Sequence, residues 1–244
     1  MKTDVTNITQ LSRSHLRGVG SGLGTLLSVI LLLIAASRPG TAIAADDWPV
    51  LLKEDFEQGA DRWSPTDAKA WKLVDASGGH AYSLFQQSKY EPPHRSPLNF
   101  SLAKDLVVGD FSLEARVRST VKDYPHRDIC LVFGYQDPAH FYYVHLGKKT
   151  DDHANQIFIV NGAPRTKIST STTAGTNWDD EWHKITIIRS AARGTIEVFW
   201  DDLERPIMTA QDKTFAWGQI GLGSFDDTGD FDNVVVRGVR VEKP

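Results

Sequence analysis

The clearest alternation of apolar and polar positions lies in residues 111–118. Phe111, Leu113, Ala115 and Val117 are apolar, and every residue between them is polar or charged. Because successive side chains of a β-strand point to opposite faces of the sheet, this pattern predicts a strand with one face in a core and the other in water.

Short runs rich in β-branched and aromatic residues recur along the chain, each bounded by Gly, Asp or Pro. Such runs are typical of strands in an antiparallel meander, and no stretch shows the period of a helix. About twelve closely spaced strands predict an all-β fold, a two-sheet antiparallel sandwich. The main predicted strands cover residues 51–57, 71–74, 80–85, 111–118, 129–135, 141–146, 156–160, 182–189, 194–202, 218–223 and 231–236.

Three segments between these runs predict turns or loops. Residues 90–97 contain three prolines, and residues 169–177 are rich in Ser, Thr and Gly, so both are expected to be surface loops. Asn161-Gly162 is a strong hairpin signal, because both residue types tolerate a positive φ.

The first 44 residues predict a signal peptide. Lys2, Arg13 and Arg17 precede an uncharged run over residues 19–37, and Ala42-Ile43-Ala44 supplies the small residues that an export peptidase recognises. Cleavage there leaves residues 45–244 as one domain that is secreted, periplasmic or at the cell surface. The alternative is a retained membrane anchor, because the uncharged run approaches the ~20 residues that a membrane span requires.

The net charge and the cysteine count limit the kinds of partner and cross-link that we expect. The formal net charge is −4 and no basic stripe is present, so a nucleic-acid partner is not expected. Cys130 is the only cysteine, which excludes an internal disulfide, and its place in an apolar run predicts a buried, inert thiol. We expect a monomer that contacts a membrane only if the N-terminal segment is retained.

The order of parts near the C-terminus resembles a known superfamily. Its elements are Trp182-His183, Ile196-x-Val198-x-Trp200-Asp201-Asp202, Gly218-x-Ile220-Gly221-Leu222-Gly223 and Phe231-Asp232-Asn233-Val234. This order is similar to the C-terminal half of concanavalin A-like lectin/glucanase domains, which include laminin G-like and glycan-binding jelly rolls. The resemblance implies a jelly-roll sandwich and a carbohydrate ligand.

Tyrosine, histidine and charged residues concentrate between positions 124 and 155, where we expect the ligand site. In the predicted strand 141–146, Tyr143 and His145 share the face opposite an apolar one. An aromatic ring beside polar side chains suits a sugar, which presents both C–H faces and hydroxyl groups. The proposed ligand contacts are Arg127, Tyr143, His145, His153 and Asn155. A solvated sheet face without a ligand would explain the same pattern.

Catalytic residues cannot be assigned. The Glu-x-Asp-x-x-Glu strand of related β-glucan hydrolases is missing, although neighbouring strands could supply a carboxylate pair. The Gln-Ile-His element of related lyases is missing too, whereas Arg127, Tyr143 and His145 are residue types that lyases use. The first hypothesis is therefore an exported carbohydrate-recognition domain. The alternatives are a glycoside hydrolase (including the 3-keto-glycoside type) or polysaccharide lyase of the same fold, and a surface module that binds a protein.

A structural Ca²⁺ joins the first and last strands in many glycan-binding jelly rolls. The resemblance places Glu57 and Asp232 as its ligands here, and hard oxygen donors suit this ion. The acidic stretch 226–230 is a second candidate, and a solvated acidic turn explains it equally well. The histidine spacings match no zinc pattern.

Overall fold

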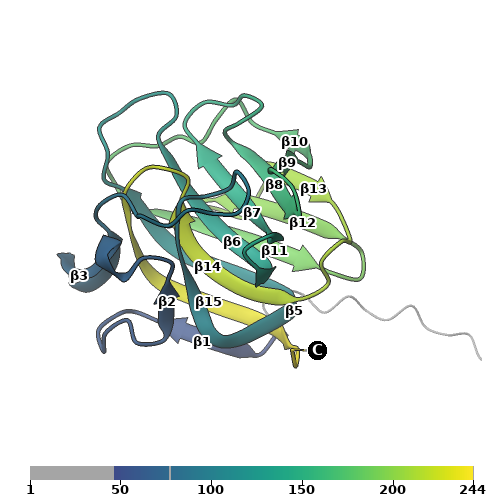
Figure 1. The fold of residues 1–244 in the computed structure, drawn as a ribbon, viewed down its shortest axis with the longest axis horizontal. Coiled ribbons are helices and arrows are strands. Elements are labelled where there is room, and N and C mark those ends of the chain that lie inside the picture. The colour runs from purple at the N-terminus through teal and green to yellow at the C-terminus, as the bar shows by residue number, and fades with distance from the viewer. Residues whose placement is uncertain (1–46, 77, 244) are drawn as a thin grey trace, which may run out of the picture. The chain divides into compact units, whose positions relative to one another are not determined.

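The computed structural model describes residues 47–76 and 78–243, and strands dominate them (Figure 1). Among these residues, the one helical element that spans three residues is a short 3₁₀ helix, Ala68–Ala70. The expected all-β class is confirmed. The strands are β1 Val50–Glu54, β2 Trp63–Pro65, β3 Trp71–Ala76, β4 Gly79–Leu84, β5 Asn99–Ser119, β6 Asp128–Asp137, β7 His140–Gly147, β8 Gln156–Asn161, β9 Thr166–Lys167, β10 Ser169–Thr172, β11 His183–Ser190, β12 Thr195–Trp200, β13 Met208–Gln211, β14 Gly218–Ser224 and β15 Gly229–Arg240.

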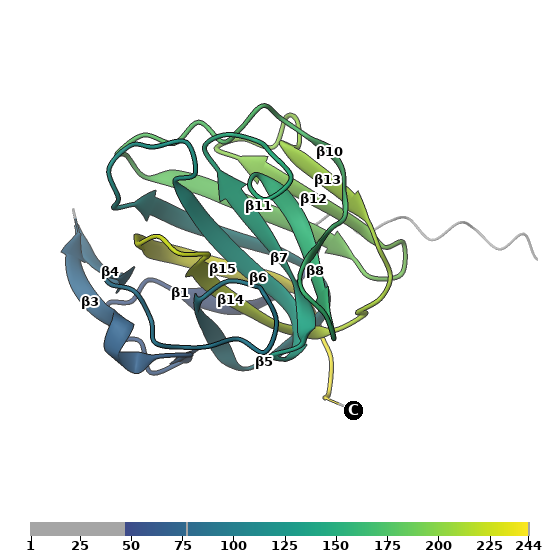
Figure 2. The same ribbon diagram turned by 45° about the horizontal axis from the view of Figure 1, so that its top comes forward.

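The long strand β5 belongs to both layers of the sandwich. Its N-terminal half pairs with β14, and its C-terminal half pairs with β11 on one side and β15 on the other. The strands are hydrogen-bonded in the order β10-β13-β12-β11-β5-β14-β6-β7-β8-β9. This continuous sheet bends at β5, and the strands on either side of β5 form the two layers. We call the layer from β14 to β9 the front sheet and the layer with β15, β11, β12 and β13 the back sheet (Figures 1 and 2).

The back sheet brings the first and last described strands together. β1 lies antiparallel to β15, with Val50 opposite Arg237 and Glu54 opposite Val234. The β3–β4 hairpin extends the same sheet, because β4 pairs with the start of β15. The pairing of the first and last described strands agrees with the jelly-roll expectation.

The main core lies between the two sheets. Phe111, Leu113, Ala115 and Val117 are at most 2% exposed, so the predicted alternation in β5 places its apolar face as expected. Aromatic rings fill one end of this core, where Tyr82 stacks on both Trp71 and Phe56 and Trp71 packs at a tilt against Phe231, with ring centroids 4.5–5.7 Å apart. Packing of this kind supplies the main stabilisation of a chain that has no disulfide.

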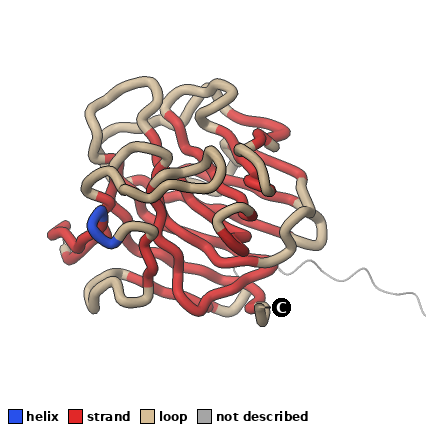
Figure 3. Tube along the Cα trace, viewed as in Figure 1, coloured by secondary structure: helices blue, strands red, loops and turns tan. Residues whose placement is uncertain are grey.

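A second, smaller apolar cluster lies on the outer face of the front sheet. Residues 85–98, which join β4 to β5 and which we call the cover segment, lie across this face (Figures 2 and 3). Tyr90 of the cover segment packs edge-on against Phe100, with ring centroids 5.6 Å apart. The buried members of this outer cluster are Phe100, Cys130, Val132, Phe141, Tyr143, Phe158 and Val160.

Two local expectations need correction. The first four residues of the expected loop 169–177 form β10, an edge strand that pairs with β13 and shows no alternation because both of its faces are partly exposed. The reversal after Asn161 is present, with Gly162 at φ +65°, but residues 162–165 separate β8 from β9, so the loop is longer than a two-residue turn.

Residues 1–44, with the predicted signal peptide or anchor, lie outside the described residues. Between residues 47 and 243, no described helix has the length and apolarity that crossing a bilayer requires.

Candidate functional site

The five predicted ligand residues gather at one end of the front sheet, but only one of them is exposed. Arg127 is 1% exposed, Tyr143 and Asn155 are 0% exposed, and His145 is 5% exposed, whereas His153 lies on the surface. Four of the five therefore cannot contact a ligand directly in this conformation. The expectation of an open sheet face around Tyr143 and His145 is corrected accordingly.

The burial of Tyr143 has a simple cause. Its ring stacks on Phe158 with centroids 5.1 Å apart, and Arg165 donates a hydrogen bond of 2.7 Å to its hydroxyl group. The Arg165 guanidinium also lies over the rings of Phe158 and Phe225, at 4.5 and 4.1 Å from their centroids. Burial raises the pKa of Tyr143 well above its ordinary value, so this phenol stays neutral.

Asn155 holds the loop between β7 and β8 to the segment after β10. Its amide nitrogen donates to Thr150 Oγ1 and Thr172 Oγ1, at 2.8 and 3.0 Å, and its amide oxygen accepts from Thr176 Oγ1 at 2.7 Å. Its backbone has φ +54°, a conformation that asparagine tolerates better than most residues. These bonds use both ends of the amide, which gives Asn155 a structural position.

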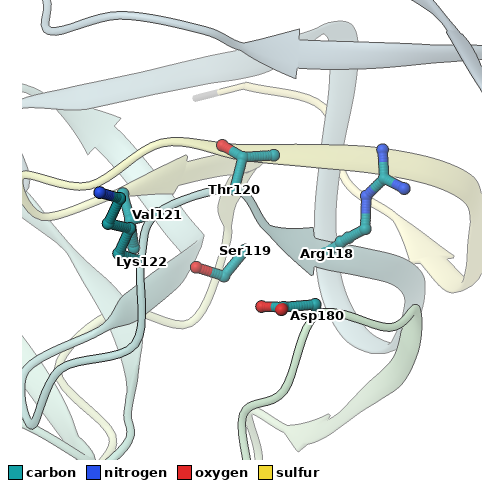
Figure 4. Close-up of a pocket in the computed structure, with 6 residues that line it drawn as sticks. All are labelled: Arg118, Ser119, Thr120, Val121, Lys122 and Asp180. Atoms are coloured by element: carbon teal, nitrogen blue, oxygen red, sulfur yellow. The ribbon is translucent and has the colours of Figure 1, made fainter.

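Arg127 lies beneath a shallow hollow at the same end of the molecule. Its guanidinium donates to Ser119 Oγ and Ser119 O, both at 2.9 Å, and to Asp180 at 2.8 Å. Figure 4 shows Asp180 across the open space from Thr120 and Lys122. The hollow, of about 360 Å³, is lined by Arg118, Ser119, Thr120, Val121, Lys122 and Asp180.

His145 connects the exposed loop to a buried carboxylate. Its Nδ1 lies 2.7 Å from the carbonyl oxygen of His153, and its Nε2 lies 3.1 Å from Asp128 Oδ2. Asp128 also accepts hydrogen bonds from Ser224 Oγ and from the backbone N–H of Phe225. Burial raises the pKa of Asp128, but the charge of His145 and the hydrogen bonds from His145, the Phe225 N–H and the Cys130 thiol outweigh it, so the net shift is downward.

Three carboxylates meet beside this imidazole. Ligand oxygens of Asp128, Asp226 and Asp227 lie within 4.8 Å of one another. Asp227 accepts hydrogen bonds from Tyr124 Oη at 2.7 Å and from the Asp128 N–H at 2.9 Å. Burial, and then the negative charge of Asp128, raise the pKa of Asp227 to about 6. Burial and the same charge raise the pKa of the exposed Asp226 as well.

Exposed polar groups continue from this acidic cluster over neighbouring loops. His126 Nε2 lies 3.6 Å from Asp151 Oδ2, and Asp151 accepts from the His153 N–H at 2.6 Å. Arg165 joins the group, because its second Nη donates to the His153 carbonyl oxygen at 3.0 Å. We call the resulting patch the loop-end surface; it consists of Tyr124, His126, Asp151, His153, Arg165, Phe225 and Asp226.

Some members of the loop-end surface were not expected from the sequence. Tyr124 and His126 lie inside the predicted window, and Asp226 belongs to the acidic stretch considered for a metal. Arg165 is the only member of the surface in its loop, and Phe225 precedes Asp226 with no local pattern that marks it as a contact residue. Only the pairing of β7 with β8 and of β6 with β14 brings these loops together.

Comparison with solved structures decides the fold. CBM66, a carbohydrate-binding module from Bacillus subtilis, is similar with a TM-score of 0.51 and 20% identity over 72% of this chain and 96% of that chain. Domain 4 of AbnA, a GH43 extracellular arabinanase from Geobacillus stearothermophilus, was solved in complex with arabinotriose. It is similar with a TM-score of 0.52 and 10% identity over 80% of this chain and 95% of that chain. The cellulose induced protein Cip1 is similar with a TM-score of 0.52 and 14% identity over 79% of this chain and 100% of that chain. The fold is the concanavalin A-like jelly roll.

Sequence comparison adds no relative to these structures. No protein-family model matches the chain, and no curated protein matches it.

The two predicted calcium ligands lie in one hollow of the jelly roll. Glu57, just after β1, and Asp232, in β15, line a hollow of about 240 Å³ together with Asp55, His80 and Arg116. Glu57 accepts from the His80 N–H at 2.6 Å. Burial raises the pKa of Asp232, and the charges of Glu57 and Asp55 add smaller upward contributions. The hollow thus gathers the oxygen donors that Ca²⁺ prefers, alongside the His80 imidazole and the positively charged Arg116 guanidinium.

Proposed function

We propose that this chain is an exported carbohydrate-binding domain that contacts its ligand through the loop-end surface. The observation that carries the proposal is the concentration of exposed carboxylates, nitrogen donors and aromatic rings at one end of this fold. Of the similar structures, one is a carbohydrate-binding module and another is an arabinanase domain in complex with arabinotriose, which supports a sugar as the ligand class.

The chemistry of the surface suits a polyhydroxylated ligand. The carboxylates of Asp151 and Asp226 accept hydrogen bonds from sugar hydroxyl groups, and the nitrogens of His153 and Arg165 donate to sugar oxygens. The ring of Tyr124, which is 37% exposed, offers a face for sugar C–H groups.

In this proposal, the buried residues that the sequence suggested as ligand contacts hold the loops of the loop-end surface in place. His145 holds the carbonyl oxygen of His153, Tyr143 holds Arg165, and Asn155 holds the loop that carries His153. Arg127 fixes the entry of the chain into β6 by its bonds to Ser119. A binding surface made of loops needs such a layer, because contacts must be held in place before the ligand arrives.

Affinity gel electrophoresis against a panel of plant and microbial polysaccharides, arabinan among them, tests the proposal. We expect at least one polysaccharide to retard the protein, and Asp226→Asn combined with His153→Ala to weaken retardation about tenfold or more. Glu197→Gln, on the back sheet, is the matched control and should behave as the wild type. Failure of every polysaccharide to retard the folded protein would contradict the proposal and favour a protein partner.

One observation favours a hydrolase as the second candidate. Asp227 has a pKa of about 6 and lies beside Asp226, so one carboxyl can hold a proton near neutral pH while a neighbour is ionised. New reducing ends in the bound polysaccharide, abolished by Asp227→Asn, would support hydrolysis, and unsaturated products would support a lyase. Binding without either product supports recognition alone.

We also propose that Glu57 and Asp232 hold a structural Ca²⁺. The ion would connect the segment after β1 to β15 and offset the repulsion among the carboxylates that line the hollow. Millimolar Ca²⁺ against excess chelator should raise the melting temperature by several degrees. Asp232→Ala should abolish this response, and Asp227→Asn should keep it. Identical melting curves with and without chelator would contradict this calcium site.

A further inference from the structure

Three different metal-binding side chains meet beneath the loop-end surface. Cys130 in β6 lies directly opposite His145 in β7, and Asp128 precedes Cys130 by two residues and so shares its face. Asp128 and Cys130 are fully buried, and His145 is 5% exposed. One carboxylate oxygen, the thiol sulfur and one ring nitrogen all lie within 4.8 Å of one another.

The orientation of His145 points to a ligand at this cluster. Its Nδ1 faces the carbonyl oxygen of His153, an acceptor, so Nδ1 carries the proton and Nε2 is directed into the cluster. Nε2 lies 3.1 Å from Asp128 Oδ2 and has no other partner among the described residues. With Nε2 neutral, its lone pair would face the Asp128 carboxylate, so this buried contact requires a positive charge, either a proton on Nε2 or a bound cation. A metal cation between the two groups would meet this requirement and would also engage the Cys130 thiol, which lies 3.4 Å from the same carboxylate oxygen.

The separations fit a tetrahedral ion. Cys130 Sγ lies 3.4 Å from Asp128 Oδ2, and His145 Nε2 lies 3.1 Å from the same oxygen. An ion about 2.3 Å from sulfur and about 2.0–2.2 Å from nitrogen and oxygen separates its ligands by roughly 3.3–3.6 Å. Small adjustments of these side chains would therefore suffice to close the site.

We infer that Asp128, Cys130 and His145 form a binding site for a thiophilic divalent cation, with zinc as the best match. A thiolate, an imidazole and a carboxylate are the ligand types of zinc sites, whereas Ca²⁺ and Mg²⁺ prefer oxygen alone. Asp226, exposed and close to Asp128, lies where a fourth ligand could come from. This site is separate from the calcium hollow and does not depend on carbohydrate binding.

Hydrogen bonds around the three ligands already resemble those that orient zinc ligands. The His153 carbonyl fixes the imidazole of His145, and Ser224 and the Phe225 N–H fix the carboxylate of Asp128. An ion here would join β6 to β7 directly and would hold the loops that carry His153 and Phe225. Cys130 would then be a ligand and not the inert thiol that its apolar surroundings suggest.

The test is metal loading of the full chain during refolding, because the cluster is buried. Protein unfolded with chelator is refolded with or without Zn²⁺ and dialysed, and its metal content is measured by plasma emission spectrometry. We expect about one zinc per chain and a higher melting temperature than the metal-free protein. Refolding with Co²⁺ should give the absorption band of a thiolate-to-cobalt charge transfer, which needs no substitution to detect.

Variants distinguish this site from other sites. Cys130→Ser and His145→Gln should lose the zinc and the cobalt band, whereas Asp232→Ala and His126→Gln should keep both. Zinc-free protein after refolding, a cobalt complex without the charge-transfer band, or zinc retained by Cys130→Ser would each overturn the inference. In those cases the cluster is a buried imidazolium–carboxylate pair.

Discussion

The two outer faces of the sandwich show the same alternation of side chains but have opposite surroundings. On the back sheet, Glu114 and Arg116 alternate with core residues and face water. On the front sheet, Phe141, Tyr143 and His145 alternate with core residues in the same way, yet they are buried under the cover segment and Arg165. A period of two therefore identifies the two faces of a strand, and the segment that packs on the outer face decides which face meets solvent.

This difference explains where a ligand surface can lie. The covered front face leaves its aromatic platform inaccessible, so the polar groups that gather around an accessible aromatic ring are those in the loops at its end. The buried cluster beneath the loops is rigid because it is packed and hydrogen-bonded. Functional groups on loops that rest on such a support are common in rigid sandwiches.

The largest expected contrast is in stability. Tyr143→Ala removes a fully buried ring and should lower the free energy of unfolding by about 3–5 kcal/mol. Glu114→Ala on the open face should change it by less than about 1 kcal/mol, because its pair with Arg237 is 3.8 Å long and partly exposed. Urea denaturation of both variants measures the contrast. Equal destabilisation would mean that the front face is not covered in solution.

Arg165 provides a second test of the difference between the two faces. Its guanidinium covers the outer face of the front sheet at the end where the loops lie. Arg165→Lys keeps the charge but loses the stacking on Phe158 and Phe225 and the bond to Tyr143. We expect a loss of about 2 kcal/mol and an increase in Tyr143 accessibility to a solution quencher of tyrosine fluorescence. Lys184→Ala on the back sheet is the control. An unchanged stability of Arg165→Lys would show that the stacking contributes little.

The smallest effect concerns pH. The pKa of Asp227 is raised to about 6 in the folded chain, so the folded state binds this proton more tightly than the unfolded state does. Asp227 therefore favours folding at low pH, and this contribution is lost as the pH rises through the folded value. Between about pH 4 and pH 7, the stability of the wild type relative to Asp227→Asn should fall by on the order of 1 kcal/mol. Parallel stability curves for the two proteins would contradict the raised pKa.

The sequence predicts the strands of both faces better than it predicts their environment. The alternation in residues 111–118 identified the buried face of β5 and the solvent-facing positions Glu114 and Arg116, although Ser112 on the same outer face is buried. Apolar residues at nearly every position of 129–133 and 157–160 are typical of strands buried on both faces, a signal that competed with the polar groups nearby. The cover itself has no such signal, because a proline-containing loop shows no period and its contact between Tyr90 and Phe100 is tertiary.

The sequence predicts where the candidate site lies better than it predicts which residues form its surface. The window 124–155 contains much of the loop-end surface, including His153. Whether a polar side chain points outward or bonds to another loop depends on distant partners, as Asn155 and Thr176 illustrate. Arg165 enters the surface through sheet pairing alone, which no single segment of sequence encodes.

The most direct test of the ligand surface is a titration followed by two-dimensional amide NMR, using a polysaccharide-derived oligosaccharide that binds in the affinity gel. The account predicts that the resonances that shift most belong to the loop-end surface, with Tyr124, His153 and Asp226 among them. Amides around Glu114 and Glu197 on the back sheet should stay unchanged. Shifts concentrated on the back sheet, with the loop-end resonances unmoved, would contradict the proposed binding surface.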